Sequence, residues 1–121
     1  MFSFARKLLL AGLVLAAAVF SAQAVSADNE WLVGTWELTR DPDGHAKDWM
    51  EFKADGQTTS ISAAGRRVPG VYTLGDGTVD LIYAFKGKTI PIRLTYGEDR
   101  KTLFARSPVT GSISEYRKVQ R

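Results

Sequence analysis

One short segment of the chain carries residue types that could bind a metal ion, in the order Asp41-Pro-Asp-Gly-His45. A calcium loop of the EF-hand type beginning at Asp41 would need glycine at its sixth position and a bidentate glutamate at its twelfth. Those positions hold Ala46 and Phe52. His45 is the only histidine and there is no cysteine, so a zinc site would have to use carboxylates, which are not the usual zinc ligands. Because Asp and Gly are favoured turn residues, we predict a turn here with an exposed histidine, and no metal ion or other cofactor.

Other catalytic arrangements do not emerge from the sequence. Serines are plentiful, but the one histidine that could act as their base lies in the polar segment just described. The carboxylates are scattered singly, and no pair suggests a glycosidase. Gly75-Asp76-Gly77 is not followed by a helical pattern, so it is a hairpin signal and not a phosphate-binding loop. We therefore expect a protein that is not an enzyme.

The elements that position these residues are predicted to be short β-strands. Apolar and polar residues alternate after residue 30, and turn residues recur about every ten positions, which is typical of an antiparallel meander. Eight strands suffice to close a small barrel, and closure removes exposed sheet edges. We predict an all-β, up-and-down antiparallel barrel of about eight strands, at residues 34–40, 48–54, 58–63, 67–74, 78–85, 89–96, 101–106 and 112–119.

The N-terminal residues have the build of a secretory signal. Arg6 and Lys7 precede an apolar run of 13 residues, and Ala22-Gln-Ala24 supplies the small residues of a cleavage site. We expect a signal peptide over 1–24, with cleavage after Ala27 as the alternative, and one barrel domain over 25–121. Without a lipid-attachment cysteine, the processed protein would be periplasmic or secreted with no stable membrane anchor.

The charge pattern argues against nucleic acid as a partner. The whole chain has a formal net charge of +3, and loss of Arg6 and Lys7 with the signal lowers it to +1. The remaining charges are mixed in sign along the chain and form no basic stripe of the kind that phosphate backbones require.

Several short motifs resemble those of a known family. Gly34-Thr35-Trp36 in the first predicted strand is similar to the N-terminal motif of lipocalins. The runs Phe52-Lys-Ala-Asp-Gly56 and Gly70-Val-Tyr72 resemble small bacterial exported lipocalin-like domains. This resemblance implies that Trp36 packs across the closed end of the barrel against a late arginine, for which Arg117 is the preferred candidate by position.

A weaker similarity is to periplasmic inhibitors of secreted metalloproteases, which are eight-stranded barrels that insert an N-terminal segment into a protease cleft. The segment Val25–Glu30 could play that part, although this family usually has a disulfide and this chain has no cysteine. An inhibitor or immunity-type protein that acts on an envelope protease or toxin is therefore the alternative function. Trp49 and Phe104, on the opposite face from the core residues of their strands, are its candidate partner surface.

The predicted inner face is rich in aromatic residues. Its members are Trp36, Met50, Phe52, Ile61, Tyr72, Leu81, Tyr83, Ile92, Leu94 and Tyr96. In so small a barrel we expect these side chains mainly to fill the interior. Tyr72, Tyr83 and Tyr96, with Phe52, could still line a pocket at the barrel mouth that offers an apolar wall and a few hydroxyl groups. The first functional expectation is therefore an exported barrel that binds a small apolar or amphipathic ligand.

Overall fold

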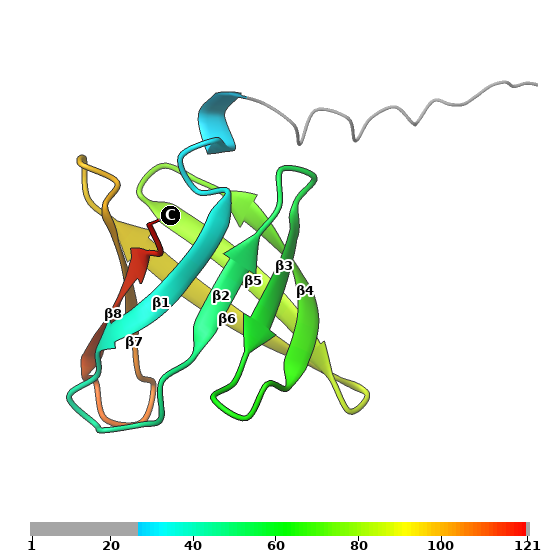
Figure 1. Cartoon of the computed structure of the whole chain (residues 1–121), viewed down its shortest axis with the longest axis vertical. Helices are drawn as coiled ribbons and strands as arrows, with labels where there is room; N and C mark the ends of the chain where they lie inside the picture. Colours follow the sequence, from blue (N-terminus) through cyan, green and yellow to red (C-terminus); the bar gives the residue numbers. More distant parts are fainter. Residues whose placement is uncertain (1–26, 121) are drawn as a thin grey trace, which may run out of the picture.

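The computed structural model describes residues 27–120 and shows a closed barrel of eight antiparallel strands (Figure 1). Each strand pairs with the next along the chain, and β8 pairs with β1. The predicted all-β, up-and-down barrel is confirmed. The predicted signal peptide lies outside the described residues, and within them no helix has the length and apolar character needed to cross a membrane. The strands are β1 (Gly34–Arg40), β2 (Trp49–Phe52), β3 (Gln57–Ile61), β4 (Arg67–Leu74), β5 (Thr78–Phe85), β6 (Lys88–Tyr96), β7 (Thr102–Arg106) and β8 (Ile113–Lys118).

The core forms from the apolar residues that alternate along each strand, because successive side chains of a strand point to opposite faces. The buried cluster consists of Leu32, Trp36, Met50, Phe52, Tyr72, Val79, Leu81, Tyr83, Leu94 and Leu103. One predicted inner residue is wrong. Ile61 pairs with Trp49 and shares its outer face, while the inward positions of β3 are Thr58 and Ser60. A polar inner residue is tolerated at Thr58 because its hydroxyl meets that of Tyr83, 3.4 Å away.

One end of the barrel, where β1 begins, is covered by residues 27–33; we call it the capped end. There the short 3₁₀ helix η2 (Ala27–Asn29) sits above the start of β1 (Figure 1). Leu32 is fully buried, and its carbonyl accepts a hydrogen bond of 2.8 Å from the Trp36 indole. The Asn29 side-chain amide donates to the Ala54 carbonyl and to the Tyr72 hydroxyl, both at 3.2 Å. The cap is thus joined to three different parts of the barrel.

Gly34 fits this end for two reasons. Its φ of +134° lies in the region that favours glycine. A Cβ atom at this position would also lie 3.0 Å from Cε of Lys118, whose side chain crosses the capped end. The glycine of the Gly34-Thr35-Trp36 motif therefore makes room for a side chain from the last strand.

The opposite end, which we call the mouth, is left partly open by unequal strand pairing. β6 pairs with β5 from Lys88 to Thr95 but with β7 only from Leu94 to Tyr96. The β5–β6 hairpin consequently projects beyond its neighbours (Figure 1). It closes with Lys86-Gly87, and both residues have positive φ, as a two-residue type I′ turn requires.

Pro91 makes the unpaired edge of β6 less able to pair with a strand of another molecule. The Tyr96 N–H donates to the Gly77 carbonyl on the β5 side, so alternate residues from Tyr96 back to Lys88 face β5. Pro91 falls in the other set, whose backbone groups face the unpaired side. Because proline has no N–H, this edge offers one donor fewer to an incoming strand.

Truncation of Leu32 tests whether the cap belongs to the folding unit. We expect Leu32→Ala to lower the free energy of unfolding by about 2–5 kcal/mol, because it leaves a cavity beneath the cap. Urea denaturation followed by tryptophan fluorescence would measure this loss. Val109→Ala, at a side chain that is 89% exposed, is the control and should change little. Equal effects of the two substitutions would show that the cap is not part of the cooperative core.

Candidate functional site

The aromatic residues predicted to line a mouth pocket do not meet in one pocket. The Tyr72 hydroxyl donates to the Lys53 carbonyl at 2.6 Å, and that of Tyr96 donates to the Gly75 carbonyl at 2.7 Å; both carbonyls lie at the capped end. Phe52 packs edge to face on Tyr72, with ring centroids 5.2 Å apart. Tyr83 alone lies toward the mouth. Burial raises the pKa of Tyr72 and of Tyr83, in keeping with hydroxyls that serve the interior.

The mouth instead carries a shallow apolar groove of about 280 Å³ on the inner face of the projecting hairpin. Ile90 and Ile92 pair with Tyr83 and Leu81, which places them on the inward face of β6. They are nevertheless 42% and 36% exposed, because the pairing of β7 with β6 begins only at Leu94 and does not reach them. The groove is also lined by Val68, Tyr83, Phe85 and Arg66.

Two cations border the aromatic end of this groove. The Arg66 guanidinium lies 5.4 Å from the centroid of the Phe85 ring, and the Lys86 ammonium lies 5.2 Å from the same point. Both distances allow a cation–π interaction, which holds the charged groups beside the apolar wall. Within the described part of the chain neither cation forms an ion pair with a carboxylate. The groove therefore combines an apolar floor with uncompensated positive charge.

A half-buried polar pair that the sequence did not indicate lies near the mouth. The Tyr116 hydroxyl donates to the Asp48 carboxylate at 2.8 Å. Burial raises the pKa of Asp48 above its ordinary value, although the hydrogen bond from Tyr116 acts to lower it. Burial and the neighbouring Asp48 charge also raise the pKa of Tyr116 far above its usual range. The sequence around Asp48 does not indicate that it contacts Tyr116. The two residues meet only because of the register in which β8 pairs with β1.

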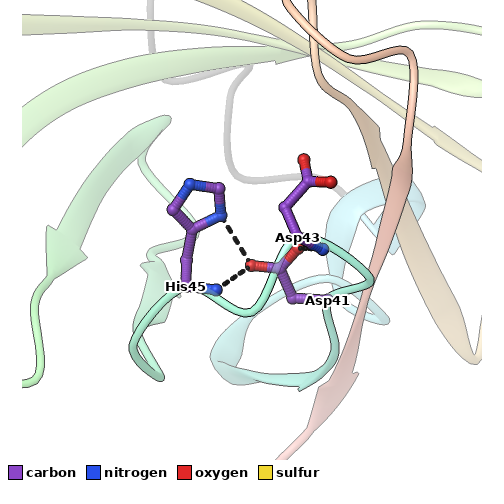
Figure 2. Close-up of side chains that lie close together, drawn as sticks. All are labelled: Asp41, Asp43 and His45. Carbon is purple, nitrogen blue, oxygen red and sulfur yellow. Dashed lines mark hydrogen bonds and ion pairs between the residues drawn. The ribbon is translucent and has the colours of Figure 1, made fainter.

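The acidic loop after β1 is built as a turn (Figure 2). One Asp41 carboxylate oxygen accepts from the Asp43 N–H at 3.0 Å and from the Ser114 hydroxyl at 3.3 Å. The other accepts from the backbone N–H and the Nδ1–H of His45, at 2.9 and 2.8 Å. The Asp43 carboxylate accepts from the Thr110 hydroxyl at 2.7 Å.

These contacts favour a turn over a metal site. Possible ligand atoms of Asp41, Asp43 and His45 lie within 4.8 Å of one another. However, a carboxylate offers about four lone-pair positions, and Asp41 uses three of them within the loop and the fourth with Ser114 of β8. Burial, the largest single influence, acts to raise the pKa of Asp41, but the hydrogen bonds from His45 and Asp43 together hold it below its usual value. The hydrogen bonds of this loop are those of a turn that is also bonded to β8 through Ser114.

The cation over the Trp36 ring is Lys118 and not Arg117. Trp36 pairs with Lys118 across β1 and β8, so the two side chains share a face, and the Lys118 ammonium lies 6.0 Å from the ring centroid. It also donates to the Trp31 carbonyl at 2.8 Å. Arg117 is displaced by one position and pairs with Glu37 on the outer face. The prediction identified the right strand and the right kind of contact but the wrong residue.

The predicted partner surface is not one patch. Trp49 and Phe104 both face outward and are half-buried, but they belong to β2 and β7. With β1 and β8 between them, they lie three strand spacings, about 14 Å, apart. The Trp49 indole is further occupied by a hydrogen bond of 3.3 Å to Glu37. The more exposed outer apolar residues are Val71 and Ile82, at 55% and 48%, which are paired across β4 and β5.

The segment predicted as a protease-inserting lead is only partly described. Residues 25 and 26 lie outside the described residues. Asn29 is buried and Glu30 follows it directly into the cap. The described part of this segment is therefore attached to the barrel and does not form a detachable arm.

No protein-family model matches the chain, and no curated protein is similar enough to count as a relative.

Replacement of Asp41 tests its role in the turn through pH. A carboxyl group whose pKa is lowered in the folded state stabilises the fold above its unfolded-state pKa, and this contribution is lost as pH falls through the folded pKa. Asp41→Asn should therefore melt below the wild type at pH 7, and the gap should narrow below about pH 4. Differential scanning calorimetry from pH 3 to 7 measures the gap. A rise in wild-type melting temperature with added Ca²⁺ or Zn²⁺, absent in Asp41→Asn, would contradict the turn assignment.

Asp48 should behave in the opposite sense. Because its pKa is raised in the folded state, the wild type loses stability as pH rises through that folded pKa. Asp48→Asn keeps an oxygen that can accept a hydrogen bond from Tyr116 and removes the half-buried charge. We expect it to match the wild type near pH 3 and to exceed it in melting temperature at pH 7. Lower stability than the wild type at both pH values would show that the carboxylate is needed for packing.

Proposed function

We propose that this protein is a non-enzymatic, exported barrel that binds an amphipathic small molecule with an anionic head in the mouth groove. The observation that supports this most directly is the exposure of two inward-facing isoleucines, Ile90 and Ile92, beside the cations Arg66 and Lys86. An apolar chain would cover the isoleucines. A carboxylate at its end would be placed near the two cations.

The size of the groove limits the ligand. Its volume of about 280 Å³ is just below the range for small-molecule sites, which is about 300–1,000 Å³. It fits a segment of an acyl chain or one small ring system, with the rest of a longer molecule outside. The tyrosine hydroxyls deeper in the barrel are already hydrogen-bonded, so specificity in this proposal comes from the apolar wall and the charged border.

Export is part of the proposal and is supported by the sequence alone. The basic and apolar N-terminal residues, followed by Ala22-Gln-Ala24, favour a periplasmic or secreted protein. Both predicted cleavage positions, after Ala24 and after Ala27, would leave Asn29 and Leu32 attached, and these are the residues that fasten the cap. The resemblance of Gly34-Thr35-Trp36 to the lipocalin motif supports the same class of exported binding barrels.

A second candidate function is binding of an envelope protein, such as a protease or toxin, through the outer surface. The observation that favours it is the exposed cross-strand pair Val71 and Ile82, followed on β6 by the exposed Pro91. Exposed apolar residues in adjacent strands form a continuous surface of the kind that partners cover. This surface differs from the one predicted from Trp49 and Phe104.

A matched pair of isoleucine variants distinguishes the two functions. Ile90 and Ile82 lie on neighbouring strands with similar exposure, one facing into the mouth and the other outward. We expect Ile90→Glu to weaken binding of cis-parinaric acid, a fluorescent fatty acid, by more than tenfold, or about 1.4 kcal/mol. Ile82→Glu should leave it unchanged. Fluorescence titration measures both.

The charge at the border can be tested in the same assay. Arg66→Gln should weaken binding of the fatty acid by up to about fivefold, since an exposed ion pair contributes about 0.2–1 kcal/mol. It should not change binding of the matching fatty alcohol, which carries no charge. Failure of the wild type to bind either compound would overturn the proposal. A protein partner that is lost on Ile82→Glu and kept on Ile90→Glu would favour the second function.

A further inference from the structure

A second depression lies at the capped end, on the side of the barrel away from the mouth. It has a volume of about 570 Å³, within the range of small-molecule sites. Two tryptophans of the cap region, Trp31 and Trp36, form part of its wall. The rest comes from the β6–β7 turn and the end of β8, and consists of Arg100, Lys101, Arg117, Lys118 and Gln120. Four of the seven lining residues are cationic and none is acidic.

The positive charge of this pocket is not neutralised by its surroundings. Among residues 27–120, none of the four cations forms an ion pair with a carboxylate. Glu37 faces Arg117 across the β1–β8 ladder, but its carboxylate contacts the Lys47 ammonium at 3.6 Å and the Trp49 indole at 3.3 Å.

The nearest acidic residues of the β6–β7 turn do not supply the missing charge either. Asp99 accepts the backbone N–H of Lys101 at 3.1 Å, as a turn residue. Glu98 and Asp76 border a separate depression, which shares Arg100 with this pocket. The pocket therefore offers four positive charges to an outside ligand.

Two of the cations are held in position by the tryptophans. The Arg100 guanidinium lies 5.5 Å from the Trp31 ring centroid, and the Lys118 ammonium is fixed between the Trp31 carbonyl and the Trp36 ring. Side chains that are ordered before binding lose less entropy when a ligand arrives.

We propose that the pocket at the capped end binds a phosphate-bearing anion. Several cations around one site favour a multiply charged ligand over a single carboxylate, and the two arginines supply the planar donor pairs that match phosphate oxygens. The phosphate groups can belong to a soluble phosphorylated molecule or to a lipid headgroup. This site is separate from the mouth groove, so it stands or falls independently of the proposed function.

Inorganic pyrophosphate is the probe for the first test. Isothermal titration calorimetry with the purified protein at low ionic strength should detect binding. The double variant Lys101→Gln/Arg117→Gln should weaken it at least tenfold, and since neither side chain makes a hydrogen bond or ion pair inside the described chain, the melting temperature should not change. The control is Lys88→Gln/Arg106→Gln, which removes one lysine and one arginine at the mouth and should bind as the wild type does.

Vesicles separate the two sources of phosphate. Cosedimentation with vesicles that contain phosphatidic acid, compared with phosphatidylcholine alone, tests the lipid headgroup. Pyrophosphate binding without vesicle binding supports a soluble ligand. Vesicle binding that is lost in Lys101→Gln/Arg117→Gln and kept in the control supports a lipid. Equal loss of binding in both double variants would show that binding depends only on the overall charge of the protein, and this would overturn the proposal. A wild type that binds neither probe would also overturn it.

Discussion

The buried hydrogen bond from the Trp36 indole to the Leu32 carbonyl connects the N-terminal segment to the first strand, and the difference between the two ends of the barrel depends on it. With Leu32 held there, the Trp31 ring packs on Tyr96 at a tilt of 53°, with 4.7 Å between ring centroids, and meets Trp36 edge-on at 6.1 Å. Lys118 then crosses over Gly34 to reach the Trp31 carbonyl. The cap, the first strand, the last strand and the end of β6 are thereby packed as one unit.

The mouth is not closed in this way because β6 extends beyond the end of its pairing with β7. Eight residue pairs join β6 to β5, but three join it to β7. Inward-facing residues near the Lys86-Gly87 turn are paired with β5 but not with β7, and the exposure of Ile90 and Ile92 follows from this. The charged border is a consequence of the same geometry, since a two-residue hairpin and the neighbouring β3–β4 loop bring Lys86 and Arg66 to one ring, Phe85.

Period-2 alternation was sufficient to predict the strands because the inward faces of most strands are mainly apolar; the predicted and observed bounds differ by at most two residues. It failed at Ile61, where β3 turns threonine and serine inward, so that hydrophobicity pointed to the wrong face. It also could not choose between Arg117 and Lys118, since a shift of one residue exchanges the faces and only the register with Trp36 decides. The groove, the Asp48–Tyr116 pair and the basic pocket join residues from distant strands and loops, and local sequence holds no signal for such contacts.

Stability gives a physical reason why both candidate sites lie at the ends of the barrel and not inside it. An unfilled cavity costs about 24 cal/mol per Å³, so an interior ligand chamber of about 300 Å³ would cost about 7 kcal/mol before a ligand arrives. A domain typically has about 5–15 kcal/mol in total, and this chain has no cysteine with which to form a disulfide. Tyr72 and Tyr83 therefore fill space and bond to neighbouring groups, while Ile90 and Arg100 sit where solvent can occupy the site at little cost. A small barrel of this kind gains binding surface by leaving its ends unequal.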